Sequence, residues 1–189
     1  MIPTEEQCQK LWDKYQLPEN KRVHVGLVAK VAKFLARKCQ MLNPPAGRAG
    51  AKCKINTELL MAGALLHDID KNAPKFPGEK HPDAAVRILR EEGMGEAADL
   101  VKTHPLHAIL DPAIAPKTIE EKLLFLADKM VKYEVIGVTA RFALWNDEHL
   151  PDTQQVILDA AYPKVKKLEK EALDLIGTDQ KRILEEMKG

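Results

Sequence analysis

The chain has 189 residues, and its 29 lysines and arginines balance 28 aspartates and glutamates to give a formal net charge of +1. This balance argues against a general binder of nucleic acid, since such a protein needs an excess of clustered cations. The length predicts one domain whose core is large enough to fold without disulfides or a structural metal.

Two helices and a loop are predicted for the first 55 residues. Thr4 and Gln7 form a capping-box pattern that opens a short helix. The segment 21–39, KRVHVGLVAKVAKFLARKC, places His24 on the same helical stripe as several apolar residues. The stretch 42–55 is rich in Pro, Gly and Ala and predicts a loop. This loop could be a lid over an anionic substrate, although a surface insertion is the simpler interpretation. Its cations are Arg48, Lys52 and Lys54.

The next predicted helix, over 56–68, ends on two polar residues. Its stretch LLMAGALL is apolar on all sides, as expected for a central helix, and Asn56 is the candidate cap. His67 and Asp68 follow directly, with Lys71 close behind. Such a segment either reaches the surface, where the polar pair is incidental, or holds the pair at the edge of the core to bind something.

Three more helices are predicted before residue 134. Pro82 suits the first position of a helix that ends near Gly93. Residues 95–104, GEAADLVKTH, predict a helix that stops at Pro105. A Thr–Glu capping box opens the predicted helix 118–133, TIEEKLLFLADKMVKY.

The C-terminal part of the chain is charged and predicted to be helical from residue 152 onward, with breaks at Pro163 and Gly177. No credible strand pattern is present, so the predicted fold class is all-α. We expect a compact helical domain over residues 1–150, with the C-terminal helices of 151–189 packed on that same domain.

Ionisable residues recur on the apolar faces of these predicted helices. They are His24, His67, Asp68, His81, His104 and Asp128. One buried imidazole bonded to a carbonyl is ordinary. Four imidazoles and two carboxylates from five elements are not, since an unpaired buried carboxylate is costly and a cation is the simplest compensation. Together these residues predict a metal site.

The order of these six residues, H…HD…H…H…D, resembles that of the HD-domain metal-dependent phosphohydrolases. The resemblance runs from about Lys21 to Val131 and includes the motifs HDIDK and LLFLADK. It implies a compact helical domain and is greatest for the branch that hydrolyses diadenosine tetraphosphate symmetrically. The chain departs from that branch in the stretch ADKMVKYEV, and it has Asp70 where the common HDIG form has glycine.

The resemblance further implies two divalent transition-metal ions that share Asp68. One ion would be held by His24, His67, Asp68 and Asp128. The second would be held by Asp68, His81 and His104. Ligands without thiolate suit Fe or Mn first, with Zn, Co or Ni as alternatives. His107 is close enough in sequence to replace His104, but it follows Pro105 and is predicted to lie off the helix.

The implied activity is hydrolysis of a small nucleotide or dinucleotide polyphosphate through a metal-bridging hydroxide. Asp68 and Lys71 are the expected catalytic residues. Lys71, Lys129 and Arg141 are candidate cations for the substrate phosphates, and a solvated surface position is the simpler interpretation for a lysine. Two alternatives stay open, namely a di-iron oxygenase with the same ligands and a regulatory module that only binds a nucleotide.

The segment MIPTEEQCQKLW is acidic and amphipathic, unlike a signal peptide, and no apolar run approaches the ~18 residues of a membrane span. Cys8, Cys39 and Cys53 fit neither a disulfide framework nor a thiolate metal site, and we expect reduced thiols. These features predict a cytoplasmic monomer or homodimer with a small phosphorylated nucleotide as its substrate, and neither nucleic acid nor membrane as its partner.

Overall fold

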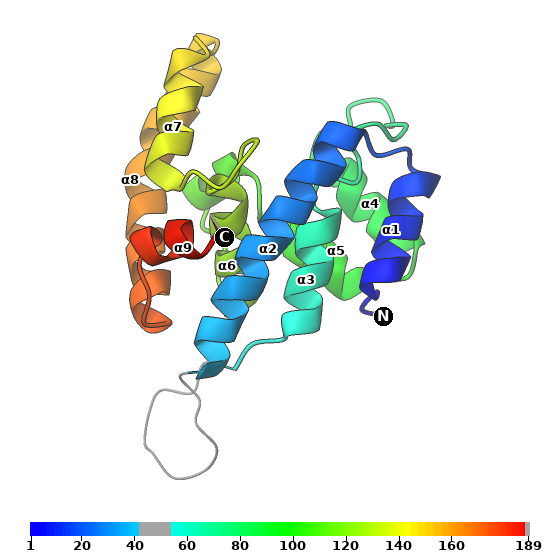
Figure 1. The fold of residues 1–189 in the computed structure, drawn as a ribbon. Helices are drawn as coiled ribbons and strands as arrows, with labels where there is room; N and C mark the ends of the chain where they lie inside the picture. Colours follow the sequence, from blue (N-terminus) through cyan, green and yellow to red (C-terminus); the bar gives the residue numbers. More distant parts are fainter. Residues whose placement is uncertain (42–53, 188–189) are drawn as a thin grey trace.

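The computed structural model describes residues 1–41 and 54–187, and Figure 1 shows that this part of the chain is a bundle of helices. The elements are α1 (Glu5–Lys14), α2 (Glu19–Met41), α3 (Thr57–Leu66), α4 (Asp83–Glu91), α5 (Gly95–Lys102), the 3-10 helix η1 (Leu106–Leu110), α6 (Ile119–Lys129), α7 (Val138–Asp147), α8 (Asp152–Leu175) and α9 (Gln180–Met187). Apart from one isolated β-bridge, no strand pairing occurs among the described residues. The prediction of an all-α fold is confirmed.

Helix α3 lies at the centre of the bundle and contacts α1, α2, α5 and α6. It begins after Asn56, whose side chain accepts the Leu59 N–H, as the sequence predicts. Gly63 allows α5 to approach closely, because an added Cβ there would lie 2.5 Å from Leu100 Cδ2. His67 and His104 each follow this contact by four residues, so the close approach of α3 and α5 brings the two imidazoles together.

Two helices end earlier than the sequence suggests. Helix α3 ends at Leu66, with His67 as its C-cap. Helix α6 begins with the predicted capping box of Thr118 but ends at Lys129 and not at residue 133. The chain turns back there, because the Met130 carbonyl accepts two backbone N–H groups from the following loop, at 2.8 and 3.0 Å.

The C-terminal part of the described chain differs most from expectation. Helix α7, next to α8 in Figure 1, was not predicted. Helix α8 runs through Pro163, so the expected break there is wrong. Pro163 and Asp159, whose carbonyl loses its helical partner, are both exposed, so water can satisfy that carbonyl. Buried residues on both sides, such as Leu158 and Val165, keep the helix packed. The break at Gly177 is confirmed.

Of the described cysteines, one departs from the prediction, and Cys53 lies outside the described residues. Cys8 is a buried free thiol, as expected, whereas Cys39 is disulfide-bonded. Disulfides are rare in the reducing cytoplasm, so the cysteines lend no support to a cytoplasmic location, which stays a prediction. Arg48 and Lys52 of the predicted loop lie outside the described residues. Across the described part of the chain, no helix combines the length and apolarity that a membrane crossing requires.

Candidate metal centre

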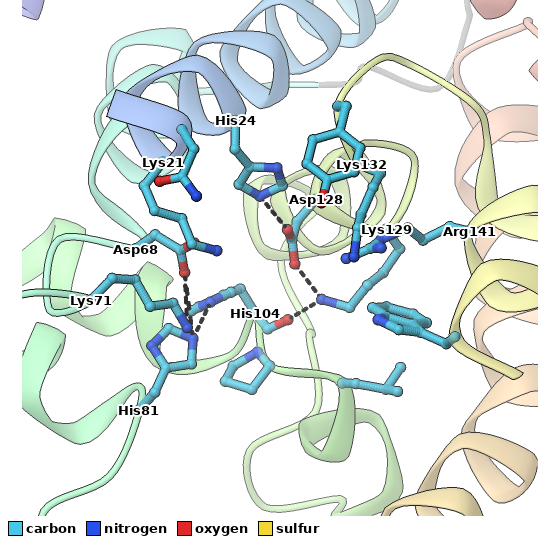
Figure 2. A pocket seen from close by; sticks show the side chains of 15 residues that line it. Lys21, His24, Asp68, Lys71, His81, His104, Asp128, Lys129, Lys132 and Arg141 are labelled. Carbon is cyan, nitrogen blue, oxygen red and sulfur yellow. Dashed lines mark hydrogen bonds and ion pairs between the residues drawn. The ribbon is translucent and has the colours of Figure 1, made fainter. Parts of the chain in front are cut away.

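Side chains from five segments converge in one cluster, and Figure 2 shows them apart from His67. His24 lies in the second turn of α2, and His67 caps the C-terminus of α3 with Asp68 next to it. His81 directly precedes the N-cap of α4, and His104 lies two residues beyond the end of α5. Asp128, the sixth residue of the cluster, is the penultimate residue of α6.

The C-terminal ends of α3, α5 and α6 therefore meet at this point. The free carbonyls of a helix C-terminus carry a negative partial charge that favours a nearby cation. With the carboxylates of Asp68 and Asp128 added, the local charge of the cluster favours a bound cation.

The six side chains form overlapping groups whose potential ligand atoms lie within 4.8 Å of one another. These groups are His24 with His67 and Asp68, Asp68 with His81 and His104, and His67 with His104 and Asp128. The first two match the two ligand sets implied by the resemblance, except that Asp128 is absent from the first. The third joins residues of both sets, so the six side chains are one continuous cluster.

Asp128 is the carboxylate closest to the first pair of imidazoles. Its Oδ1 lies 3.1 Å from His24 Nε2 and 3.5 Å from His67 Nε2. Its Oδ2 accepts a hydrogen bond from the ammonium of Lys129. Asp128 thus has one oxygen facing the imidazoles and the other held by a lysine from the same helix.

Three of the imidazoles are fixed by hydrogen bonds at Nδ1. The Nδ1–H of His67 donates to the Ala64 carbonyl at 2.9 Å, and that of His104 donates to the Val101 carbonyl at 2.5 Å. The Nδ1–H of His81 donates to Asp70 Oδ1 at 2.9 Å. In a neutral ring with Nδ1 protonated, Nε2 carries the free lone pair. An outer acceptor that fixes the tautomer in this way is typical of histidines that ligate metals.

The free Nε2 atoms face positions that suit a metal ion. His67 Nε2 is buried and has no hydrogen-bond partner among the described residues. The Nε2 atoms of His81 and His104 lie only 3.0 Å apart, with His81 Nε2 also 3.8 Å from Asp68 Oδ1. Two lone pairs at that distance repel each other, whereas a cation held by both nitrogens would remove the repulsion. The donor set fits a metal.

The pKa values of the cluster have a consistent physical cause. Burial acts to raise the pKa of Asp128, but Lys129, the hydrogen bond of His24 and the nearby His67 ring outweigh it and hold that pKa well below its usual range. Burial, together with the charges of His67 and His81, lowers the pKa of His104 well below its usual value. The carboxylate is therefore ionised and the His104 ring neutral, which are the forms that bind metal.

His67 shows how strongly this place favours positive charge. Burial acts to lower the pKa of His67, but the negative charges of Asp68 and Asp128 outweigh it and raise that pKa. A bound cation would satisfy the same carboxylates without protonating the ring.

A pocket of about 300 Å³ opens over the cluster and is lined by basic side chains as well as the candidate ligands. The ammonium groups of Lys71 and Lys21 each lie 3.3 Å from an oxygen of Asp68. Lys129, in contrast, is buried, and its ammonium also donates a hydrogen bond to the His104 carbonyl at 2.8 Å. Arg141 comes from α7 and also lines the pocket.

A family model of the HD domain matches residues 23–132, which is more than half of the chain. The chain belongs to the HD-domain family. No solved structure matches it. The matched range contains all six residues of the cluster, and it ends before α7, so Arg141 lies outside the matched HD domain.

Two residues that contact the HD-domain cluster, Asp70 and Lys21, had no role predicted from the sequence. Asp70 is fully buried and holds His81 in place, with the ammonium of Lys75 3.8 Å from its second oxygen. Lys21 lies three residues before His24 on α2, a helical spacing that places both on one face and could have identified it. His107, the alternative to His104, is exposed on η1 and belongs to none of the metal-binding groups found among the described residues.

Proposed function

We propose that this protein is a metal-dependent phosphohydrolase that acts on a small nucleotide or dinucleotide polyphosphate. Metal-dependent hydrolysis is typical of HD domains, and the chain belongs to this family. The observation that carries the proposal is the 3.0 Å separation of the Nε2 atoms of His81 and His104, both rings being held through Nδ1. This pair is stable only with a cation or a proton between its nitrogens.

The proposed centre holds two ions, with Asp68 shared between them. His24, His67 and Asp128 complete one set of ligands, and His81 and His104 complete the other. Ligation by imidazole and carboxylate without thiolate suits iron or manganese. When bound, the ions would supply the Lewis acidity that activates water and neutralises charge on the phosphoryl oxygens.

The residues around the cluster have separate tasks in this proposal. Lys71 and Lys21 flank Asp68 on the pocket side, where their ammonium groups would bind oxygens of the phosphate under attack. Lys129 fixes the orientation of Asp128, and two of its three N–H donors are already engaged, by Asp128 and by the His104 carbonyl. Asp70 orients the His81 ring.

The role of Lys71 is open to a direct test. The variant Lys71→Ala is expected to lower kcat/KM for phosphorylated substrates about tenfold to a hundredfold, the range typical of one lost hydrogen bond to a charged group. Its metal content should equal that of the wild type, because the ammonium is no ligand. Lys30→Ala, which removes an exposed cation on α2 outside the pocket, is the matched control. Unchanged kinetics for Lys71→Ala would show that Lys71 is a solvated surface residue without a role in substrate binding.

The proposed activity is tested by metal analysis of the purified protein, followed by assays of phosphate release. The nucleotide panel should include diadenosine tetraphosphate, with Mn(II) or Fe(II) supplied. Consumption of oxygen without phosphate release would identify a di-iron oxygenase instead. Nucleotide binding without either activity would identify a regulatory module. Salt-dependent submicromolar binding of generic DNA or RNA would contradict the proposed restriction to small nucleotides.

A further inference from the structure

Arg141 has no anionic partner within the described part of the chain. Its Nε and Nη1 atoms are buried and donate no hydrogen bond, and its side chain forms no ion pair with any described residue. Burial lowers the pKa of this guanidinium from its usual range, yet an arginine side chain remains charged in proteins. A buried, unpaired charge is costly, and that cost is offset when an anion binds.

The carboxylates near Arg141 are already engaged. Asp128 accepts from His24 and Lys129, and Glu148 forms an ion pair with Lys132 at 2.7 Å. The pocket contains acidic residues, but these contacts leave Arg141 without a carboxylate partner in the described part of the chain. A ligand from solution can supply the missing anion.

The guanidinium of Arg141 is also held in a fixed orientation. It stacks on Trp145, with the guanidinium carbon 4.2 Å from the ring centroid, and both residues line the pocket over the metal centre. Stacking occupies one face of the planar group and leaves Nε and Nη1 on its N–H edge without a hydrogen-bond partner among the described residues. Such an edge matches two phosphate oxygens at once, which a lysine cannot do.

The basic residues lie at two separate sides of the pocket. Figure 2 shows Lys21 and Lys71 beside Asp68 on one side, and Arg141 beyond Asp128 on the other, next to Lys132. A single phosphate at the metal centre would meet the lysines beside Asp68. A ligand that also reaches Arg141 must carry a second anionic group.

We infer that Arg141 binds a second phosphate of the substrate, next to the phosphate that reacts at the metal centre. This inference rests on the proposed function and makes it more specific. The preferred ligands are then nucleotides with at least two linked phosphates, and nucleoside monophosphates are poor ligands. Arg141 acts as a residue that determines specificity and is no metal ligand.

The test compares two ligands that differ in one phosphate, on the metal-loaded full-length protein. Isothermal titration calorimetry measures the binding of AMP and of α,β-methylene-ADP, whose P–C–P linkage cannot be hydrolysed. The wild type should bind the diphosphate analogue more tightly. In Arg141→Gln, affinity for the analogue should fall about tenfold to a hundredfold, as expected when one charged hydrogen-bonding partner is lost, while AMP binding stays unchanged.

Two further variants make the result specific. Arg141→Lys keeps the charge and most of the stem but lacks the planar fork, so the preference for the analogue should be partly retained. Arg90→Gln removes an arginine that is 58% exposed and paired with Asp99 away from the pocket, and it should behave as the wild type. Circular dichroism confirms that each variant keeps its helical fold, and Arg141→Lys provides the measurement if Arg141→Gln does not fold.

Three outcomes would overturn the inference. They are equal affinity of the wild type for both ligands, an unchanged preference in the Arg141 variants, and an equal loss of binding for AMP and the analogue. The last would place Arg141 at the reacting phosphate. The readout is binding and not phosphate release, so the anion site and the hydrolytic activity are tested separately. A preference that depends on Arg141, found in a protein that releases no phosphate from any nucleotide, would support the anion site and refute the phosphohydrolase.

Discussion

Replacing Asp68 with alanine is expected to remove both metal ions from the protein. Hydrolysis should slow by a factor on the order of 10³ or more, because two-metal catalysis contributes several kcal/mol. Asp68 is the residue that the two proposed ligand sets share, and its side chain is buried among His24, His67, His81 and His104. Without this carboxylate, Asp128 is the one carboxylate left in the metal-binding groups of the described chain, beside four imidazoles. That charge is too small to hold two divalent ions.

The measurement is metal content by mass spectrometry, made on the same sample as the rate of phosphate release. Asp68→Asn is the isosteric companion, since it keeps the shape and removes the charge. Asp99→Ala, which removes an exposed aspartate on α5, is the matched control and should retain both ions. Far-ultraviolet circular dichroism should be unchanged in all three variants, because the apolar faces of the helices are untouched. Two ions bound to a folded Asp68→Ala would refute the shared carboxylate.

The candidate metal centre could be predicted largely from helical periodicity. His24, His104 and Asp128 each lie on the apolar stripe of a helix predicted from the sequence, so a side chain capable of binding metal is expected to point toward the core. The run before His67 is apolar on all sides and forms the central helix α3. The sequence alone predicts that several residues capable of binding metal point toward the core. It does not show the close approach at Gly63 that makes two of them neighbours.

The features that the sequence did not reveal depend on tertiary structure. Helix α7 has only two buried residues, Val138 and Phe142, so its hydrophobic pattern is weak and packing against α8 defines it. Arg141 could be proposed as a cation from the sequence, but its stacking on Trp145 and its missing partner appear only in the fold. The continuity of α8 through Pro163 also appears only in the fold, because the packing of α8 outweighs the local propensity of proline to break the helix.

Helix ends explain why the site lies where it does. Helices α3, α5 and α6 all end at the cluster, and their terminal turns supply candidate metal ligands and the groups that orient them. The carbonyls of Ala64 and Val101, in the last turns of α3 and α5, accept the Nδ1–H groups of His67 and His104. The carbonyl groups that helix termination leaves unpaired thus set the tautomer of these two histidines. A site built this way tolerates changes at the surface but depends on where each helix stops.

The variant His104→Ala separates the two proposed ions. His104 belongs with His81 and Asp68 to the second ligand set, and its Nε2 lies 3.0 Å from His81 Nε2. Removing this imidazole leaves two ligands for the second ion and four for the first. We therefore expect about half of the metal to be lost. Most of the hydrolytic rate should be lost with it, because one ion cannot bind the phosphoryl oxygens from both sides.

The matched control for this variant lies only three residues away. His107 is exposed on η1 and outside the metal-binding groups, so His107→Ala should retain both ions and the full rate. The deciding measurement is the metal stoichiometry, determined together with the hydrolytic rate. Circular dichroism must confirm the fold, because His104 is buried and its removal leaves a cavity. A folded His104→Ala protein with two ions and full activity would show that His104 is a core histidine hydrogen-bonded to Val101. A loss of metal in His107→Ala would show that His107 is the ligand instead.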